Sequence, residues 1–121
     1  MSEKPLSGFK VLVVEDDYFI AEEAHDVLRD AGAEVLGPAA SIETARNLLA
    51  DTRPDYALLD INLGSGPDFT LARSMTAIGV PVVLVTGYDR SVIPSDLTCL
   101  PCLQKPASAQ KLVQTVLELR R

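Results

Sequence analysis

A buried-strand pattern that ends in a carboxylate is the feature that most constrains this chain. Residues 54–63 read PDYALLDINL, in which an apolar run leads directly into Asp60 and a glycine-rich turn follows. A short, continuous apolar run bounded by turn residues indicates a strand that is buried on both faces. Ligands of open α/β sheets bind just beyond the carboxyl ends of such strands. Asp60 therefore lies where a binding site is expected.

The rest of the chain alternates between strand-like and helix-like patterns. Further strands are predicted over residues 9–14, 34–39, 80–85 and 99–104, and a helical pattern follows each strand. Crossovers of this length indicate a parallel sheet that helices cover on both faces. The sequence thus predicts an α/β fold of five strands and five helices in three layers. Pro94 interrupts residues 88–98, so we expect a short or distorted helix there.

Reactive side chains follow the carboxyl ends of four predicted strands. They are Glu15 and Asp16, then Asp60, Thr86 and Lys105 in chain order. The predicted topology brings all of them to one edge of the sheet. Carboxylates share a small site only when something compensates their charge, and carboxylate and carbonyl oxygens suit Mg²⁺. With a metal in place, Asp60 can act as a nucleophile toward a phosphoryl group, whose oxygens Lys105 and Thr86 would contact.

Charge and composition exclude other classes of function. The net charge of −6 argues against binding to the phosphates of nucleic acids, and no apolar run is long enough to span a membrane. The first residues, MSEKPLSG, lack the hydrophobic core of a signal peptide, so we expect a cytoplasmic protein. Residues 1–8 are expected to form a polar tail, and residues 9–121 are expected to form a single domain.

Four motifs together resemble the receiver domains of two-component response regulators, over residues 9–120. The motifs are VLVVEDD at 11–17, LLDINL at 58–63, VTG at 85–87 and QKP at 104–106. The resemblance implies a flavodoxin-like (βα)5 fold, in which the parallel strands lie in the order 2-1-3-4-5. The run PVVLVTGYD is also similar, in part, to a subgroup of stand-alone receivers that carry a "FAT GUY" signature.

The resemblance implies a role for each residue of the motifs. Asp60 would be the phosphoacceptor, Thr86 the switch hydroxyl and Lys105 the residue that binds the phosphoryl group. The implied Mg²⁺ site comprises Asp16, Asp60, the backbone carbonyl of Asn62, and Glu15 acting through water. Asp17 is more simply the N-cap of the helix that follows. The peptide bond between Lys105 and Pro106 is expected to be cis.

The resemblance also implies partners. The phosphoryl group would come from a histidine kinase or a histidine phosphotransfer protein, and the domain would be a signalling protein rather than an enzyme, although it catalyses its own phosphorylation and dephosphorylation. Because the chain ends at Arg121, we expect no output domain. Output would pass through a protein that contacts residues 89–117, or the domain would act as a phosphoryl shuttle or sink. Receivers often dimerise, so a homodimer is also considered.

Departures from the family pattern leave two alternatives open. Cys102 stands three residues before Lys105, where receivers usually carry an aromatic residue that responds to the switch hydroxyl. The first alternative is therefore a pseudo-receiver, an interaction module that works without phosphorylation. The second is redox modulation through the pair Cys99 and Cys102. A redox pair usually begins at a helix N-terminus, whereas this pair leads into a predicted strand, so packing is the simpler role for both cysteines.

Overall fold

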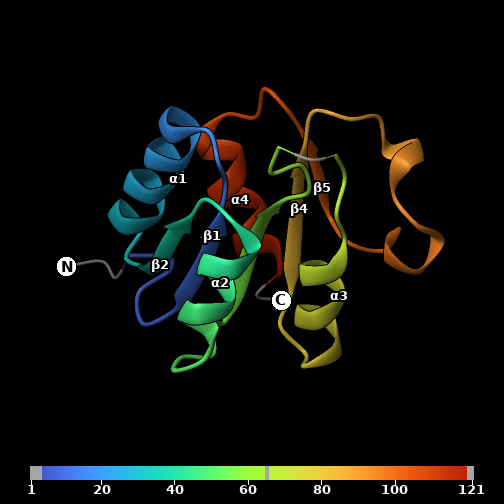
Figure 1. Cartoon of the computed structure of the whole chain (residues 1–121). Coiled ribbons are helices and arrows are strands. Elements are labelled where there is room, and N and C mark those ends of the chain that lie inside the picture. Colours follow the sequence, from blue (N-terminus) through green and yellow to red (C-terminus); the bar gives the residue numbers. More distant parts are fainter. Residues whose placement is uncertain (1–3, 65, 120–121) are drawn as a thin grey trace.

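A single parallel sheet forms the centre of the molecule (Figure 1), and the computed structural model describes residues 4–64 and 66–119. The strands lie in the order β2-β1-β3-β4-β5, which confirms the predicted order. Their bounds are β1 (Lys10–Val14), β2 (Glu34–Ala39), β3 (Tyr56–Asp60), β4 (Val82–Thr86) and β5 (Cys102–Gln104). The helices are α1 (Tyr18–Asp30), α2 (Ile42–Leu49), α3 (Thr70–Ala77) and α4 (Ala109–Leu119).

The helices cover the two faces of the sheet in pairs (Figure 1). Successive residues of a strand point to opposite faces, so each central strand contributes to two separate apolar clusters. Leu12 and Leu59 pack with residues of α2 and α3, whereas Val13 and Leu58 pack with residues of α1 and α4. This burial on both faces explains why β1, β3 and β4 are continuous apolar runs in the sequence.

Side-chain caps mark the starts of α1, α2 and α4, and the cap of α1 is the one expected from the sequence. Asp17 accepts a hydrogen bond from the backbone N–H of Ile20 at the start of α1. Ser41 caps α2 in the same way, and Ser108 accepts from the N–H of Lys111 in α4. Each cap satisfies one of the N–H groups that the first helical turn leaves without a partner.

The sequence predicted a short or distorted fifth helix within residues 88–98, and the described structure confirms that no regular α-helix forms there. Two short 3-10 turns, η1 (Arg90–Val92) and η2 (Ser95–Leu97), replace it, so the described residues contain four α-helices. Pro94 lies between the turns and cannot continue a helix. The segment is instead anchored by the buried side chains of Ile93 and Leu97.

The segment predicted to be a polar tail contributes to the core. The side chain of Leu6 is fully buried, and its backbone N–H donates to the carbonyl of Ala31 at 2.7 Å. Gly32 lies beneath this segment with a φ of +101°, and a Cβ at this position would come within 2.8 Å of Lys4. Residues 4–8 thus pack against the end of α1. None of the described helices is long and apolar enough to cross a membrane.

Candidate functional site

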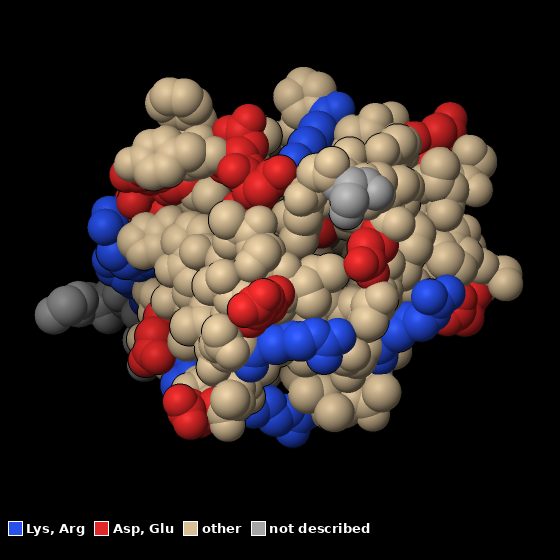
Figure 2. Space-filling model, viewed as in Figure 1, with Lys and Arg blue, Asp and Glu red and all other residues tan. Residues whose placement is uncertain are grey.

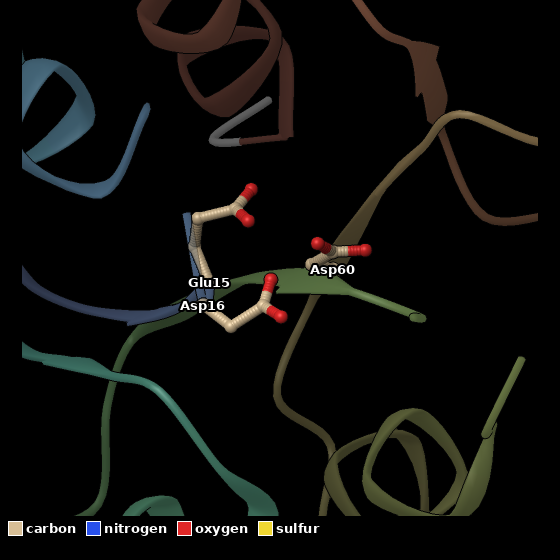
Figure 3. Close-up of side chains that lie close together, drawn as sticks. All are labelled: Glu15, Asp16 and Asp60. Atoms are coloured by element: carbon tan, nitrogen blue, oxygen red, sulfur yellow. The ribbon is translucent and has the colours of Figure 1, made fainter. Parts of the chain in front are cut away.

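Three carboxylates meet at the carboxyl ends of β1 and β3, as the sequence predicted. Glu15 and Asp16 follow β1, and Asp60 is the last residue of β3. One carboxylate oxygen from each residue lies within 4.8 Å of the other two, and all three side chains point into the same space (Figure 3). The space-filling view shows acidic side chains gathered around this end of the molecule, with a basic side chain beside them (Figure 2).

The positive charge of one lysine, Lys105, compensates the negative charges of the two buried carboxylates. Glu15 is 5% exposed and Asp60 is 7% exposed. The ammonium group of Lys105 lies 2.8 Å from Glu15 Oε1 and 2.8 Å from Asp60 Oδ2. Desolvation alone would lower the pKa of Lys105, but the hydrogen bonds to Asp60 and Glu15 outweigh it and raise that pKa. Lys105 is therefore a permanent cation in this site.

For Glu15, burial changes the pKa more than the hydrogen bonds that oppose it. Desolvation raises the pKa of this carboxyl from 4.5 to about 7, although Lys105 and the backbone N–H of Asp17 oppose the shift. The neighbouring carboxylate of Asp60 adds to the rise. Like charges at this spacing disfavour the ionised form, so a further cation bound here would favour ionisation of Glu15.

The orientation of Asp60 is fixed at both oxygens. Oδ1 accepts from the backbone N–H of Asn62 at 2.9 Å, and Oδ2 accepts from Lys105. On the neighbouring strand Thr86 is completely buried, and its Oγ1 accepts from the backbone N–H of Tyr88 at 2.9 Å. These contacts place a carboxylate, a hydroxyl and an ammonium group at the ends of β3, β4 and β5.

The sequence did not predict a contact between the side chains of Asn62 and Tyr88. Nδ2 of Asn62 donates to the hydroxyl of Tyr88 at 3.0 Å. Oδ1 of Asn62 accepts from the N–H groups of Gly64 and Gly66, at 3.0 and 3.2 Å. Each residue lies two positions after the end of a strand, and β3 and β4 are neighbours in the sheet. That common spacing is the signal from which their proximity could have been predicted.

An open hollow of about 610 Å³ lies above the carboxylates, bordered by Asp16, Asp60, Asn62, Tyr88 and Lys105 among others. Gly87 also borders it, and a Cβ there would meet nothing within 4 Å. The hollow is large enough for a small tetrahedral anion with its hydration. The carboxylates of Glu15, Asp16 and Asp60 offer oxygen atoms, which are the ligands that Mg²⁺ prefers. The residues present thus fit a magnesium ion.

The cysteine pair lies away from these groups. Cys99 is exposed, Cys102 is half-buried in β5, and both are free thiols. Burial raises the pKa of Cys102, and the nearby charge of Arg90 offsets this only in part. A raised pKa disfavours the thiolate that redox exchange requires. The expected cis bond between Lys105 and Pro106 is present.

Comparisons with known proteins agree with this geometry. The family model described as "Response regulator receiver domain" matches residues 11–117. The sensory transduction protein LytT of Bacillus cereus is 30% identical over 116 residues, which cover 93% of this chain and 47% of LytT. The chain thus spans about half the length of the curated relatives it matches.

Solved structures share the whole fold. The solution structure of SdrG from Sphingomonas melonis Fr1 is 28% identical, with a TM-score of 0.79 and full coverage of both chains. The receiver domain of PhyR from Erythrobacter litoralis has a TM-score of 0.81 at 24% identity, over 93% of this chain and 89% of that one. The PhyR likeness supports the fold alone.

Proposed function

Since the chain belongs to the family of response regulator receiver domains, which are phosphorylated on an aspartate, we propose that its phosphoacceptor is Asp60. The donor would be a phosphohistidine of a histidine kinase or a histidine phosphotransfer protein. The observation that carries this assignment is the position of the Asp60 carboxylate. It lies beside the hollow, it is held at both oxygens, and a lysine ammonium group lies 2.8 Å away.

The transfer needs no general base in this site. An oxygen of the ionised Asp60 carboxylate forms a bond to phosphorus, and the bond between phosphorus and the histidine nitrogen breaks. The electron pair of that bond stays on the nitrogen that loses the phosphoryl group. The other ring nitrogen of the donor carries a proton, so the histidine leaves as a neutral imidazole. The Asn62 N–H orients the carboxylate, Lys105 neutralises phosphoryl oxygens, and the Thr86 hydroxyl donates a hydrogen bond to one of them.

Magnesium completes the charge balance in this proposal. Asp16, Asp60 and the backbone carbonyl of Asn62 would hold the ion directly, and Glu15 would act through a water molecule. When bound, Mg²⁺ would supply positive charge to the phosphoryl oxygens as they approach Asp60. A bound cation would also favour the ionised form of Glu15, whose pKa burial raises.

The functional consequence would be a change in protein contacts. A phosphoryl group adds negative charge and strong acceptor oxygens to the edge of the sheet. The domain would signal through the surface formed by residues 89–117, or pass the phosphoryl group on as a shuttle or sink. Cys102, in place of the usual aromatic residue, favours one second candidate. This is a pseudo-receiver that binds its partner without phosphorylation.

Intact mass spectrometry separates these two functions. The protein is incubated with acetyl phosphate, a small phosphoryl donor, with and without Mg²⁺. We expect the mass of one added phosphoryl group with Mg²⁺, and no adduct without Mg²⁺ or in Asp60→Ala. Rapid hydrolysis of the adduct is detected as Mg²⁺-dependent release of phosphate. The absence of both adduct and phosphate release, also with a phosphohistidine donor, would exclude phosphorylation and favour the pseudo-receiver.

A further inference from the structure

Three hydrogen bonds connect the carboxylate of Asp60 to the hydroxyl of Thr86. The first joins the Asn62 N–H to Asp60 Oδ1, the second joins Asn62 Nδ2 to the Tyr88 hydroxyl, and the third joins the Tyr88 N–H to Thr86 Oγ1. The donor-to-acceptor distances are 2.9, 3.0 and 2.9 Å. The two ends of this chain of bonds are the groups that the phosphoryl group would contact. We call the bond between the side chains of Asn62 and Tyr88 the strap.

The amide of Asn62 has little freedom to turn away from Tyr88. Its oxygen already accepts from the N–H groups of Gly64 and Gly66. An amide oxygen cannot donate, so this arrangement directs the NH₂ group toward the Tyr88 hydroxyl. The strap therefore ties the loop after β3 to the first residue of the segment 88–101.

That segment has few other links to the phosphoryl site. Ile93 and Leu97 anchor it to the apolar core, and Asp96 forms a two-bond ion pair with Arg73 of α3. The side chain of Arg73 is 50% exposed and that of Asp96 is 56% exposed. An ion pair this exposed contributes little to stability. Among the described residues, Tyr88 is the member of this segment that bonds to both Asn62 and Thr86.

We propose that Tyr88 is a positioning residue that couples the phosphorylation state of Asp60 to the segment 88–101, with the strap holding the unphosphorylated arrangement. The proposal rests on phosphorylation of Asp60. An acyl phosphate carries its charge on the phosphoryl oxygens, so Oδ1 becomes a weaker acceptor for the Asn62 N–H. The same oxygens attract the Thr86 hydroxyl, and rotation of that side chain removes the acceptor of the Tyr88 N–H. Both ends of the chain of bonds weaken, and Tyr88 is released.

Removal of the Tyr88 hydroxyl tests the direction of this coupling. The probe is beryllofluoride with Mg²⁺, a tetrahedral analogue of the phosphoryl group, titrated into the protein and followed by NMR. Because the strap opposes the loaded arrangement, Tyr88→Phe should bind beryllofluoride more tightly, by about 2- to 10-fold for the loss of one neutral hydrogen bond. Tyr18→Phe makes the same chemical change on an exposed side chain of α1 and should match the wild type.

A second readout separates coupling from a merely structural role. In Tyr88→Phe without beryllofluoride, the backbone amide signals of Ile93 and Leu97 should move part of the way toward their positions in the loaded wild type. A loss of packing alone would move them in unrelated directions. Unchanged or weaker beryllofluoride binding by Tyr88→Phe, in a wild type that binds it, would overturn the coupling alone. A wild type that does not bind beryllofluoride with Mg²⁺ would overturn the proposed function and the coupling together.

Discussion

The ammonium group of Lys105 lies 2.8 Å from the Oδ2 atom of Asp60, across the end of the strand that separates them. Lys105 follows β5 and Asp60 ends β3, with β4 between them in the sheet. The same ammonium group is 2.8 Å from Glu15, which follows β1. One lysine thus joins carboxylates from two strands. The charge balance of the site depends on it whenever no other cation is bound.

Replacement of Lys105 should slow phosphorylation more than it affects folding. Lys105→Met removes the cation that faces the phosphoryl oxygens but keeps a flexible side chain of similar length. A single charged or hydrogen-bonding group aimed at a developing anion typically accounts for a factor of about a hundred in rate. We therefore expect phosphorylation by acetyl phosphate to slow by about that factor, measured as the initial rate of adduct formation by intact mass spectrometry.

The matched control for this change is Lys111→Met. Lys111 is an exposed residue of α4, so the variant loses the same charge at a distance from the site. It should react at the rate of the wild type. A Lys105→Met protein that remains folded, shown by its circular dichroism, and reacts as fast as Lys111→Met would contradict the role of Lys105.

Asp16 and Asp17 should differ in their effect on magnesium binding although they are adjacent. Asp16→Asn removes a proposed direct ligand, and we expect the dissociation constant for Mg²⁺ to rise at least about tenfold, as is typical when a metal site is perturbed. Asp17→Asn removes the same charge but keeps an oxygen that can cap α1. Its affinity should remain close to that of the wild type. Titration calorimetry measures both, and equal weakening by the two variants would argue against direct ligation by Asp16.

Much of the fold could be predicted because the central strands are buried on both faces. The bounds predicted for β2, residues 34–39, are those observed, and the apolar run before Asp60 is β3. The segment 88–98 could not be predicted in the same way. Its shape depends on tertiary contacts, namely the burial of Ile93 and the burial of Leu97. Neither contact leaves a periodic pattern in the sequence.

In the candidate site, too, some features could be predicted from the sequence and others depend on tertiary contacts. Topology alone placed Asp60, Thr86 and Lys105 at one edge, because parallel strands bring their carboxyl ends together. The strap between Asn62 and Tyr88 depends on side-chain rotamers and on the loop that orients the Asn62 amide. The sequence alone therefore does not predict this hydrogen bond, because the side-chain rotamers depend on the folded backbone.

The buried Leu6 makes the N-terminal segment a testable part of the fold. Truncation of a fully buried leucine to alanine typically costs about 2–5 kcal/mol. Leu6→Ala should therefore lower the free energy of unfolding by about 2–5 kcal/mol, because the side chain is fully buried. Urea denaturation followed by circular dichroism measures the change. Lys4→Ala, at an exposed neighbour, should unfold at the wild-type midpoint. If Leu6→Ala does the same, residues 4–8 are a tail, as the sequence suggested.

The pH dependence of stability should report the burial of Glu15. Desolvation is the main cause that raises the pKa of this carboxyl from 4.5 to about 7. Between these values the folded protein holds the proton more tightly than the unfolded chain, so the stability contributed by Glu15 is lost as pH rises. The loss would reach at most about 3 kcal/mol above the upper value. The lowered pKa values of Asp68 and Asp96 affect stability mainly around and below their ordinary value of 3.8, which lies outside this window.

Urea denaturation without Mg²⁺, at a pH near 4.5 and at one above 7, measures this loss. The wild type should be less stable at the higher pH. Glu15→Gln cannot ionise at this position, so its stability should be nearly flat across the window. Saturating Mg²⁺ should restore the stability of the wild type at the higher pH, because the ion favours the ionised carboxylates. A wild type that becomes more stable as pH rises through this window would show that Lys105, and not desolvation, dominates the environment of Glu15.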